Sequence, residues 1–169
     1  MRIYSAKVPK LSADIVTAVT REKDVEVTSP REVQLDVEAV LNQYVKDEQE
    51  VAERAKNLMA QRNLPQTEFN RIKKLVADER KIKIGDDAID YILDQLVEML
   101  MHSANVEEIF AEDYVLRRKM REPLRAEASQ EQELQNEVRA QLRHVQEGTS
   151  KWEVEYHRMM EDLKRRKGL

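Results

Sequence analysis

The stretch GDDAIDYILDQLVEMLM (residues 85–101) carries the broadest apolar helical face of the chain. Its apolar residues recur at intervals of three and four, which is the period of an α-helix with one buried face. Gly85 turns the chain, Asp86 is placed to cap the helix, and three acidic residues interrupt the apolar run, so the stretch is too short and too charged to span a bilayer. It predicts a core helix whose buried positions are Ile89, Ile92, Leu93, Leu96, Val97, Leu100 and Met101.

The composition of the whole chain agrees with a protein built from long helices. Of 169 residues, 37% are charged and 41% are hydrophobic, which is enough for a core. An all-β domain needs many turns and many residues that favour strands. The chain has only three Gly, four Pro and few aromatic residues, so an all-β domain is excluded. The absence of cysteine excludes a disulfide framework, thiolate zinc sites and thiol catalysis. A net charge of −4 argues against a basic surface over the whole chain of the kind that binds duplex DNA.

The first hundred residues contain two similar segments, each of which is typical of a helix, a short β-triplet and a capped helix. We expect the two units to pack with pseudo-twofold symmetry, because one unit alone could not bury its apolar face. The triplets Val25–Val27 and Ile82–Ile84 would then pair as a two-stranded ribbon. The alternative is that two amphipathic segments match by chance. At offsets of 57 and then 56, the matching pairs are Ile15/Ile72, Val19/Val76, Glu22/Glu79, Val25/Ile82, Val27/Ile84, Val33/Ile89, Val37/Leu93, Val40/Leu96, Leu41/Val97 and Val45/Met101.

The end of the chain predicts an antiparallel helical hairpin with a narrow seam of the coiled-coil kind. Gly148 suits the left-handed end of the first helix, and Ser150 is placed to cap the second. Trp152 and Tyr156 lie on the seam, where Trp152 either anchors the hairpin within its own chain or contacts another molecule; the first interpretation is favoured. The seam positions are Leu134, Val138, Leu142 and Val145, and then Trp152, Tyr156, Met159 and Leu163.

Two units follow from these patterns. Residues 1–112 would form a helical core of two related helix-turn-helix units, and residues 113–169 would form a long helix, kinked at Pro123, and the hairpin. Within the first unit, Ser29-Pro30 predicts the start of a long helix that ends before Pro65. The segment from Val106 to Phe110 is expected to be a short capped helix.

Two basic clusters are the candidate sites for RNA or ribosome contact. Acidic residues 107, 108, 112 and 113 precede the first cluster and could neutralise it, while the second closes a helix, where cations oppose the macrodipole. Aromatic residues are too few for an obvious platform that stacks single-stranded bases. The clusters are Arg117, Arg118, Lys119, Arg121 and Arg125, and then Lys164, Arg165, Arg166 and Lys167.

No catalytic motif is present. The chain has no phosphate loop, dinucleotide fingerprint, nucleophile elbow or metal-protease motif, and the loops after residues 20 and 77 lack the ligand pattern of a calcium-binding helix-loop-helix. His102, with Glu98 one turn before it and Glu107 and Glu108 nearby, is the best metal candidate, but a single histidine with scattered carboxylates is a weak signal. We therefore expect no catalytic residues, no metal and no cofactor.

Several segments resemble the bacterial domain-of-unknown-function family number 507. They are Met1–Ser5, residues 90–103 with Leu100-Met101-His102-Ser103, residues 106–113, Leu116–Met120, and the stretch from Glu147 through Trp152 and Tyr156 to Arg165–Leu169. The similarity covers essentially the whole chain. It implies a helical protein of the bacterial cytoplasm, and it carries over no activity and no catalytic residues.

The sequence thus predicts an all-α protein that is not an enzyme and that presents helical surfaces to a protein partner. A second copy of the chain is one candidate partner, and a membrane is not. Binding of RNA or the ribosome through the basic clusters is the second hypothesis, and a metal protein or enzyme centred on His102 is the third. The residues expected to make contacts are the two basic clusters, Trp152 and Tyr156.

Overall fold

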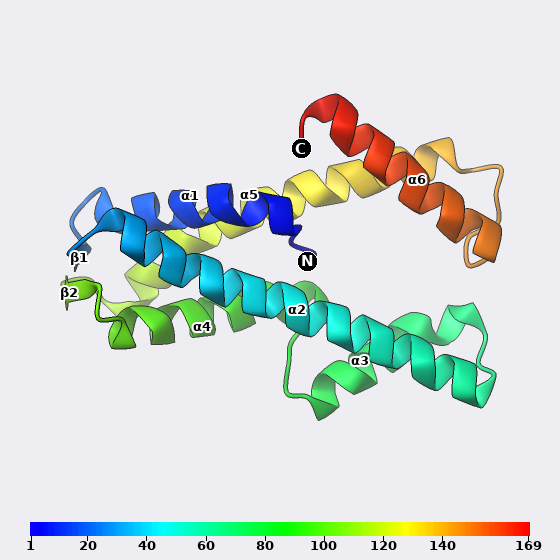
Figure 1. The fold of residues 1–169 in the computed structure, drawn as a ribbon, viewed down its shortest axis with the longest axis horizontal. Coiled ribbons are helices and arrows are strands. Elements are labelled where there is room, and N and C mark those ends of the chain that lie inside the picture. Colours follow the sequence, from blue (N-terminus) through cyan, green and yellow to red (C-terminus); the bar gives the residue numbers. More distant parts are fainter.

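Six α-helices and one small ribbon make up the computed structural model, which describes residues 1–169 (Figure 1). The all-α fold that the sequence predicts is confirmed. None of the helices has the length and apolar character that crossing a membrane requires. The helices are α1 (Val8–Thr20), α2 (Pro30–Arg62), α3 (Phe69–Glu79), α4 (Ala88–His102), α5 (Asp113–Gln141) and α6 (Ser150–Lys167), and the strands are β1 (Val25–Val27) and β2 (Val106–Ile109).

Local sequence signals explain where the long helices begin and end. Helix α2 begins at Pro30, as predicted, although the Ser29 side chain makes no capping hydrogen bond. It ends at Asn63, which adopts a left-handed conformation (φ 52°) that asparagine tolerates better than most residues. Helix α6 is capped by Thr149, one residue before the predicted cap, and its hydroxyl accepts a hydrogen bond from the Trp152 backbone N–H at 3.3 Å.

Helix α2 is the longest helix, and three other helices pack against it (Figure 1). Helices α1 and α4 pack on its first half, and α3 packs on its second half. The apolar face of α4 predicted from the sequence lies in this core, with Ile92, Leu93 and Leu96 fully buried. The predicted burial of Met101 is wrong, because this residue of the last turn is 68% exposed. The first half of α5 completes the core with three further buried side chains, Leu116, Met120 and Leu124. The core therefore extends past the boundary that we expected after residue 112.

The ribbon forms between partners that the sequence did not predict. Strand β1 pairs antiparallel with β2, with Val25 opposite Ile109 and Glu26 opposite Glu108. The predicted pairing of Val25–Val27 with Ile82–Ile84 is wrong, and so is the predicted helix at Val106–Phe110, which is strand β2. The spacing of Val106, Ile109 and Phe110 fits a helix, but pairing with a strand far away in the chain decides the structure.

The two repeat units pack differently. Helices α1 and α2 lie side by side as a hairpin, whereas α3 and α4 follow one another along α2 (Figure 1). The segment Ile82–Ile84 is a connection rather than a strand, although Ile82 is buried. The expected pseudo-twofold pairing of the triplets is therefore absent from this arrangement.

The C-terminal hairpin forms as predicted, but its first helix ends at Gln141, and Gly148, the predicted end, lies in the connection before α6. Helix α5 continues through Pro123 without interruption, and α6 folds back along its second half (Figure 1). A second, smaller core joins the two helices, and it is separate from the core around α2. Its buried members are Leu134, Val138, Leu142, Met160 and Leu163, with Val145, Trp152, Tyr156 and Met159 packed against them.

Candidate functional site

A cleft opens between two helical arms. The second half of α2 with α3 forms one arm, the α2–α3 arm, and the second half of α5 with α6 forms the other, the α5–α6 arm; they diverge from the middle of the molecule (Figure 1). The cleft has a volume of about 460 Å³ and is lined by residues of both arms. The side chains of Phe69, Trp152 and Tyr156 give it aromatic walls, and Lys56 and Glu48 give it charge.

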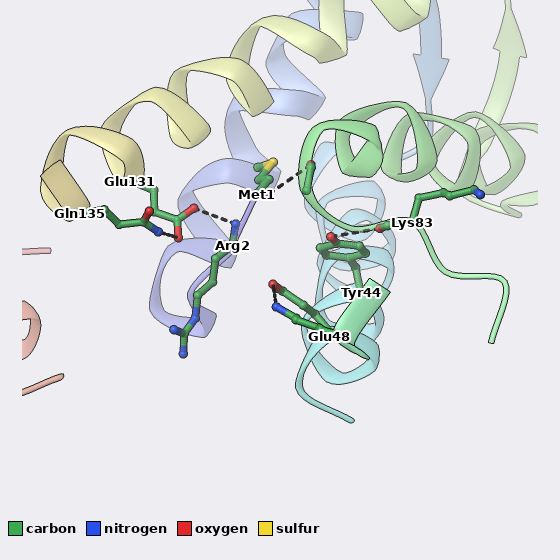
Figure 2. Close-up of polar contacts among 9 residues, drawn as sticks. Met1, Arg2, Tyr44, Glu48, Lys83, Glu131 and Gln135 are labelled. Carbon is green, nitrogen blue, oxygen red and sulfur yellow. Dashed lines mark hydrogen bonds and ion pairs between the residues drawn. The ribbon is translucent and has the colours of Figure 1, made fainter. Parts of the chain in front are cut away.

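The first residues of the chain form the floor where the two arms meet. The backbone N–H of Arg2 donates a hydrogen bond of 2.7 Å to Oε2 of Glu131 on α5, and Gln135 Nε2 donates one of 2.9 Å to Oε1 of the same carboxylate (Figure 2). Glu131 is only 4% exposed. Burial raises the pKa of its carboxyl group, against the opposing effect of the Arg2 N–H. A buried carboxylate thus ties the N-terminus to the α5–α6 arm.

Two further hydrogen bonds involve the connection before α4, one from the N-terminus and one from α2. The Met1 amino group donates to the Gly85 carbonyl at 3.3 Å, and the hydroxyl of the buried Tyr44 donates to the Lys83 carbonyl at 3.3 Å (Figure 2). Burial, followed by the neighbouring Glu48, raises the pKa of Tyr44. These bonds hold the N-terminal segment to the connection before α4, and this connection to α2.

Tyr4 joins the N-terminus to the end of α6. Its ring has the guanidinium carbon of Arg2 at 5.3 Å from its centroid and the Lys164 ammonium group over its face. Such contacts attract a cation to the electron-rich ring. Burial, and then the Glu131 charge, raise the pKa of Tyr4 to about 12. Burial, and then the Arg2 charge, lower the pKa of Lys164 to about 8.

Both arms contribute polar and aromatic contacts along the walls. The rings of Trp152 and Tyr156 stack with their centroids 4.8 Å apart. Lys73 on α3 pairs with Glu48 on α2 at 3.4 Å, and both side chains are largely buried. Gln66, just before α3, donates a hydrogen bond to Glu153 on α6, which joins the arms across the cleft. The cleft therefore combines aromatic faces with hydrogen-bonding groups, which are the elements that bind polypeptide segments.

A family model described as "Protein of unknown function (DUF507)" matches residues 1–169. The chain belongs to the DUF507 family. The resemblance drawn from the sequence is therefore confirmed over the whole chain. No curated protein matches this DUF507 chain.

In this DUF507 protein, acidic residues pair with three of the five cations of the first basic cluster; Asp113 is one of those that the sequence suggested, and the others lie farther away in the chain. Arg117 pairs with Asp94 and Asp113, and Arg121 pairs with Asp90 at 2.6 Å. Lys119 pairs with Glu22 and Asp24, which attaches α5 to the turn before β1. These hydrogen bonds raise the pKa values of Arg117 and Lys119. Arg118 and Arg125 are exposed and form no ion pair.

The second basic cluster divides in the same way. Lys164 lies on Tyr4, Arg165 pairs with Asp162 at 2.6 Å, and Lys167 pairs with Glu137 at 2.8 Å. Arg166 is exposed and forms no ion pair. The structure thus keeps the two clusters on separate helices and engages most of their cations within the chain.

His102 lies in an exposed position at the end of α4. Its Nδ1 atom is 2.9 Å from the Glu98 carbonyl oxygen and 3.6 Å from the Glu98 carboxylate. No group of three His, Cys, Asp or Glu side chains is placed to hold a metal ion. His102 and Glu98 alone would leave most of the coordination shell of a metal to water.

Sequence reasoning did not identify the contacts that join the N-terminus to α5 and α6 beside the cleft. Arg2, Tyr4 and Glu131 have no shared motif, and their contacts span more than a hundred residues. One signal was present for Glu131, because it lies three residues before Leu134 on the seam of the hairpin. A charged residue on an apolar face indicates a specific partner.

Proposed function

We propose that this protein is a non-enzymatic interaction module of the bacterial cytoplasm that holds a segment of a partner protein between its two arms. The observation that carries the proposal is the stacked pair Trp152 and Tyr156 on the wall of the cleft. Both side chains are half-buried, so part of each aromatic ring stays available to a partner. Aromatic residues in such positions contribute a large share of the binding energy in protein interfaces.

The way in which the two arms are joined supports this function. Each arm is a pair of packed helices, and Gln66 and Glu153 are the residues that bridge them across the cleft. A partner segment that replaced this hydrogen bond could enter the cleft without disturbing either core. Lys56 is exposed on the α2 wall with no ion pair, which leaves a charge free for a partner.

Contact with RNA or the ribosome is less favoured. Binding to phosphates requires cations that are free to replace counterions. The pairing of Arg117, Lys119 and Arg121 with carboxylates removes the centre of the first cluster from that role. Arg118, Arg125 and Arg166 remain exposed. We therefore propose a protein as the partner.

The experiment is site-specific photocrosslinking in cells. A photoreactive amino acid replaces Gln49, which lines the cleft, or Gln132, an exposed glutamine on α5 that does not line it. We expect a crosslinked partner protein from position 49 and none from position 132. The partner is then identified, purified and bound to the wild-type protein in vitro, where Lys56→Glu and Trp152→Ala should both weaken binding.

Three results would contradict the proposal. They are equal crosslinking at both positions, a crosslinked product with the mass of two copies of the chain, and binding of the purified partner that neither variant weakens. Crosslinking to RNA from either position would favour the second hypothesis. Thermal unfolding by circular dichroism shows whether Trp152→Ala remains folded, and Lys56→Glu changes an exposed side chain that has no partner in the chain.

A further inference from the structure

The end of the molecule opposite the arms carries a second exposed surface. We define the ribbon-end surface as the apolar residues Met101, Phe110 and Tyr114 together with the acidic residues Glu26, Glu107 and Glu108. The three apolar side chains are 68%, 60% and 67% exposed. Single exposed apolar residues are ordinary, but half of the large exposed apolar residues of the chain lie at this one end.

The packing of α4 and α5 places the three apolar residues at the same end of the molecule. The ion pairs Asp90–Arg121 and Asp94–Arg117 fix the two helices side by side and antiparallel. The end of α4, with Met101, therefore lies beside the start of α5, with Tyr114. Phe110 lies in the connection between them, directly after β2.

The backbone around Phe110 is held in place by the ribbon. The Phe110 N–H donates a hydrogen bond of 2.8 Å to the Asp24 carbonyl, next to β1. Asp24 in turn accepts a hydrogen bond from Lys119 on α5. An exposed aromatic ring on a fixed backbone loses less entropy on binding than one on a mobile loop.

The charges of the ribbon indicate what the surface would bind. Glu26 and Glu108 lie directly opposite one another in the ribbon, and Glu107 is adjacent. None of the three forms an ion pair, although Glu22 and Asp24 nearby are paired with Lys119. Like charges directly opposite each other destabilise a strand pair. A basic partner would remove this repulsion, and an extended chain could add to the ribbon, since each of its two strands pairs with no further strand.

We propose that the ribbon-end surface docks an extended basic segment of a partner protein that also carries aromatic or aliphatic side chains. The carboxylates would repel nucleic acid and anionic lipid. They would also oppose a twofold contact with a second copy of the chain, because such a contact places the same patch against itself. This surface is distinct from the cleft between the arms, so the proposal stands independently of the function proposed above.

A phage-displayed library of twelve-residue random peptides, selected on the purified wild-type protein, tests the proposal. We expect enriched peptides to be rich in Lys and Arg and to contain apolar residues. Synthetic copies with a fluorescent label then give dissociation constants by anisotropy. Peptides in which Gln replaces every Lys and Arg should bind about tenfold more weakly or worse.

Matched variants locate the binding site. The triple variant Glu26→Gln, Glu107→Gln, Glu108→Gln should weaken binding about tenfold. The triple variant Glu53→Gln, Glu79→Gln, Glu161→Gln makes the same change in net charge at exposed glutamates elsewhere and should leave binding unchanged. Phe110→Ser should weaken binding, and Val154→Ser, at an equally exposed residue on α6, should not.

The results that overturn the proposal are equally definite. They are the absence of any enriched peptide, enrichment of peptides without net positive charge, and equal binding by the variants and their controls. Concentration-dependent dimerisation in sedimentation velocity that Phe110→Ser abolishes would assign the surface to self-association instead. Trp152→Ala should leave peptide binding unchanged, because Trp152 lines the cleft. A failure of the proposal for the ribbon-end surface can therefore be told apart from a failure of the proposal for the cleft.

Discussion

The backbone N–H of Arg2 and the carboxylate of Glu131 are 2.7 Å apart, although 129 residues separate them in the sequence. This bond is the point at which the N-terminal segment, the body and the α5–α6 arm meet (Figure 2). Apart from this bond and the continuous helix α5, three side-chain contacts join the α5–α6 arm to the rest of the molecule. They are Tyr4 with Lys164, Lys7 with Gln130, and Gln66 with Glu153. The orientation of the arm therefore depends on a small number of contacts.

Glu131→Ala should lower the free energy of unfolding by about 1–3 kcal/mol, because it leaves the Arg2 N–H without its acceptor in a buried place. Urea unfolding followed by circular dichroism measures the loss. Glu133→Ala is the control, since Glu133 is exposed on the same helix and forms no ion pair. It should change stability by no more than about 0.5 kcal/mol. Equal losses in the two variants would contradict the role of Glu131.

The stability of the wild-type protein relative to Glu131→Gln should fall as pH rises. Burial raises the pKa of Glu131 in the folded protein, so the folded state holds a proton that the unfolded state releases. The stability contributed by the protonated group is present below the ordinary pKa of a glutamate. It is lost as pH rises through the raised pKa. Unfolding at a series of pH values from about 4 upward gives the difference, since other groups titrate alike in both proteins.

Lys164 should react with acetic anhydride ahead of the exposed lysines at neutral pH. Burial lowers its pKa to about 8, so a larger fraction of its amine is unprotonated. Its side chain also lines a pocket of about 190 Å³, together with Tyr4 and Leu134. Peptide mass spectrometry after brief labelling measures the rate at each lysine. Lys56 is the control, because it is exposed and forms no ion pair. Labelling repeated over a range of pH gives the midpoint at each lysine, and a midpoint for Lys164 no lower than that for Lys56 would contradict the lowered pKa.

The two apolar cores should respond separately to truncation. Leu142→Ala removes a buried side chain of the hairpin core, and it should cost about 2–5 kcal/mol of local stability. Hydrogen exchange should then accelerate in α6 and the second half of α5, while α1 and α4 keep their protection. Leu124→Ala, in the core around α2, should instead accelerate exchange in α1 and α4. Uniform acceleration in both variants would show that the cores unfold as one unit.

Pro123→Ala should stabilise the protein by about 1–3 kcal/mol. Proline in the interior of a helix removes one backbone hydrogen bond and crowds the preceding turn. Here it lies inside α5, so the Lys119 carbonyl lacks its ordinary donor four residues later. Thermal unfolding measures the change. Lower stability in the variant would show that the proline ring contributes more through packing than the helix loses.

Periodicity was sufficient to predict the parts of the fold that depend on local sequence. Most of the predicted apolar face of α4 is buried, and the seam from Leu134 to Leu163 is buried or partly buried, because a helix with a regular apolar stripe buries that stripe against its neighbours. Met101 is the exception on α4, since it lies in the last turn of the helix and is 68% exposed. The start of α2 at Pro30 follows from the fixed backbone angle of proline.

Contacts between distant residues could not be predicted in the same way. The segments around Val106 and Ile82 both carry short apolar patterns, and only the pairing with β1 makes one of them a strand. The partners of Lys119 lie at Glu22 and Asp24, whereas the sequence suggested the acidic residues just before the cluster. Charge alone does not say which of 33 acidic residues will be near a given lysine.

The contact of Tyr4 with Lys164 cannot form until nearly the whole chain has been translated. Residues near the N-terminus leave the ribosome first, yet Tyr4 meets its partner only after α6 has been made. Strand β1 likewise waits for β2, some eighty residues later. The nascent chain must therefore keep α1 and α2 in solution without their final neighbours, and the highly charged outer face of α2 is well suited to that interval.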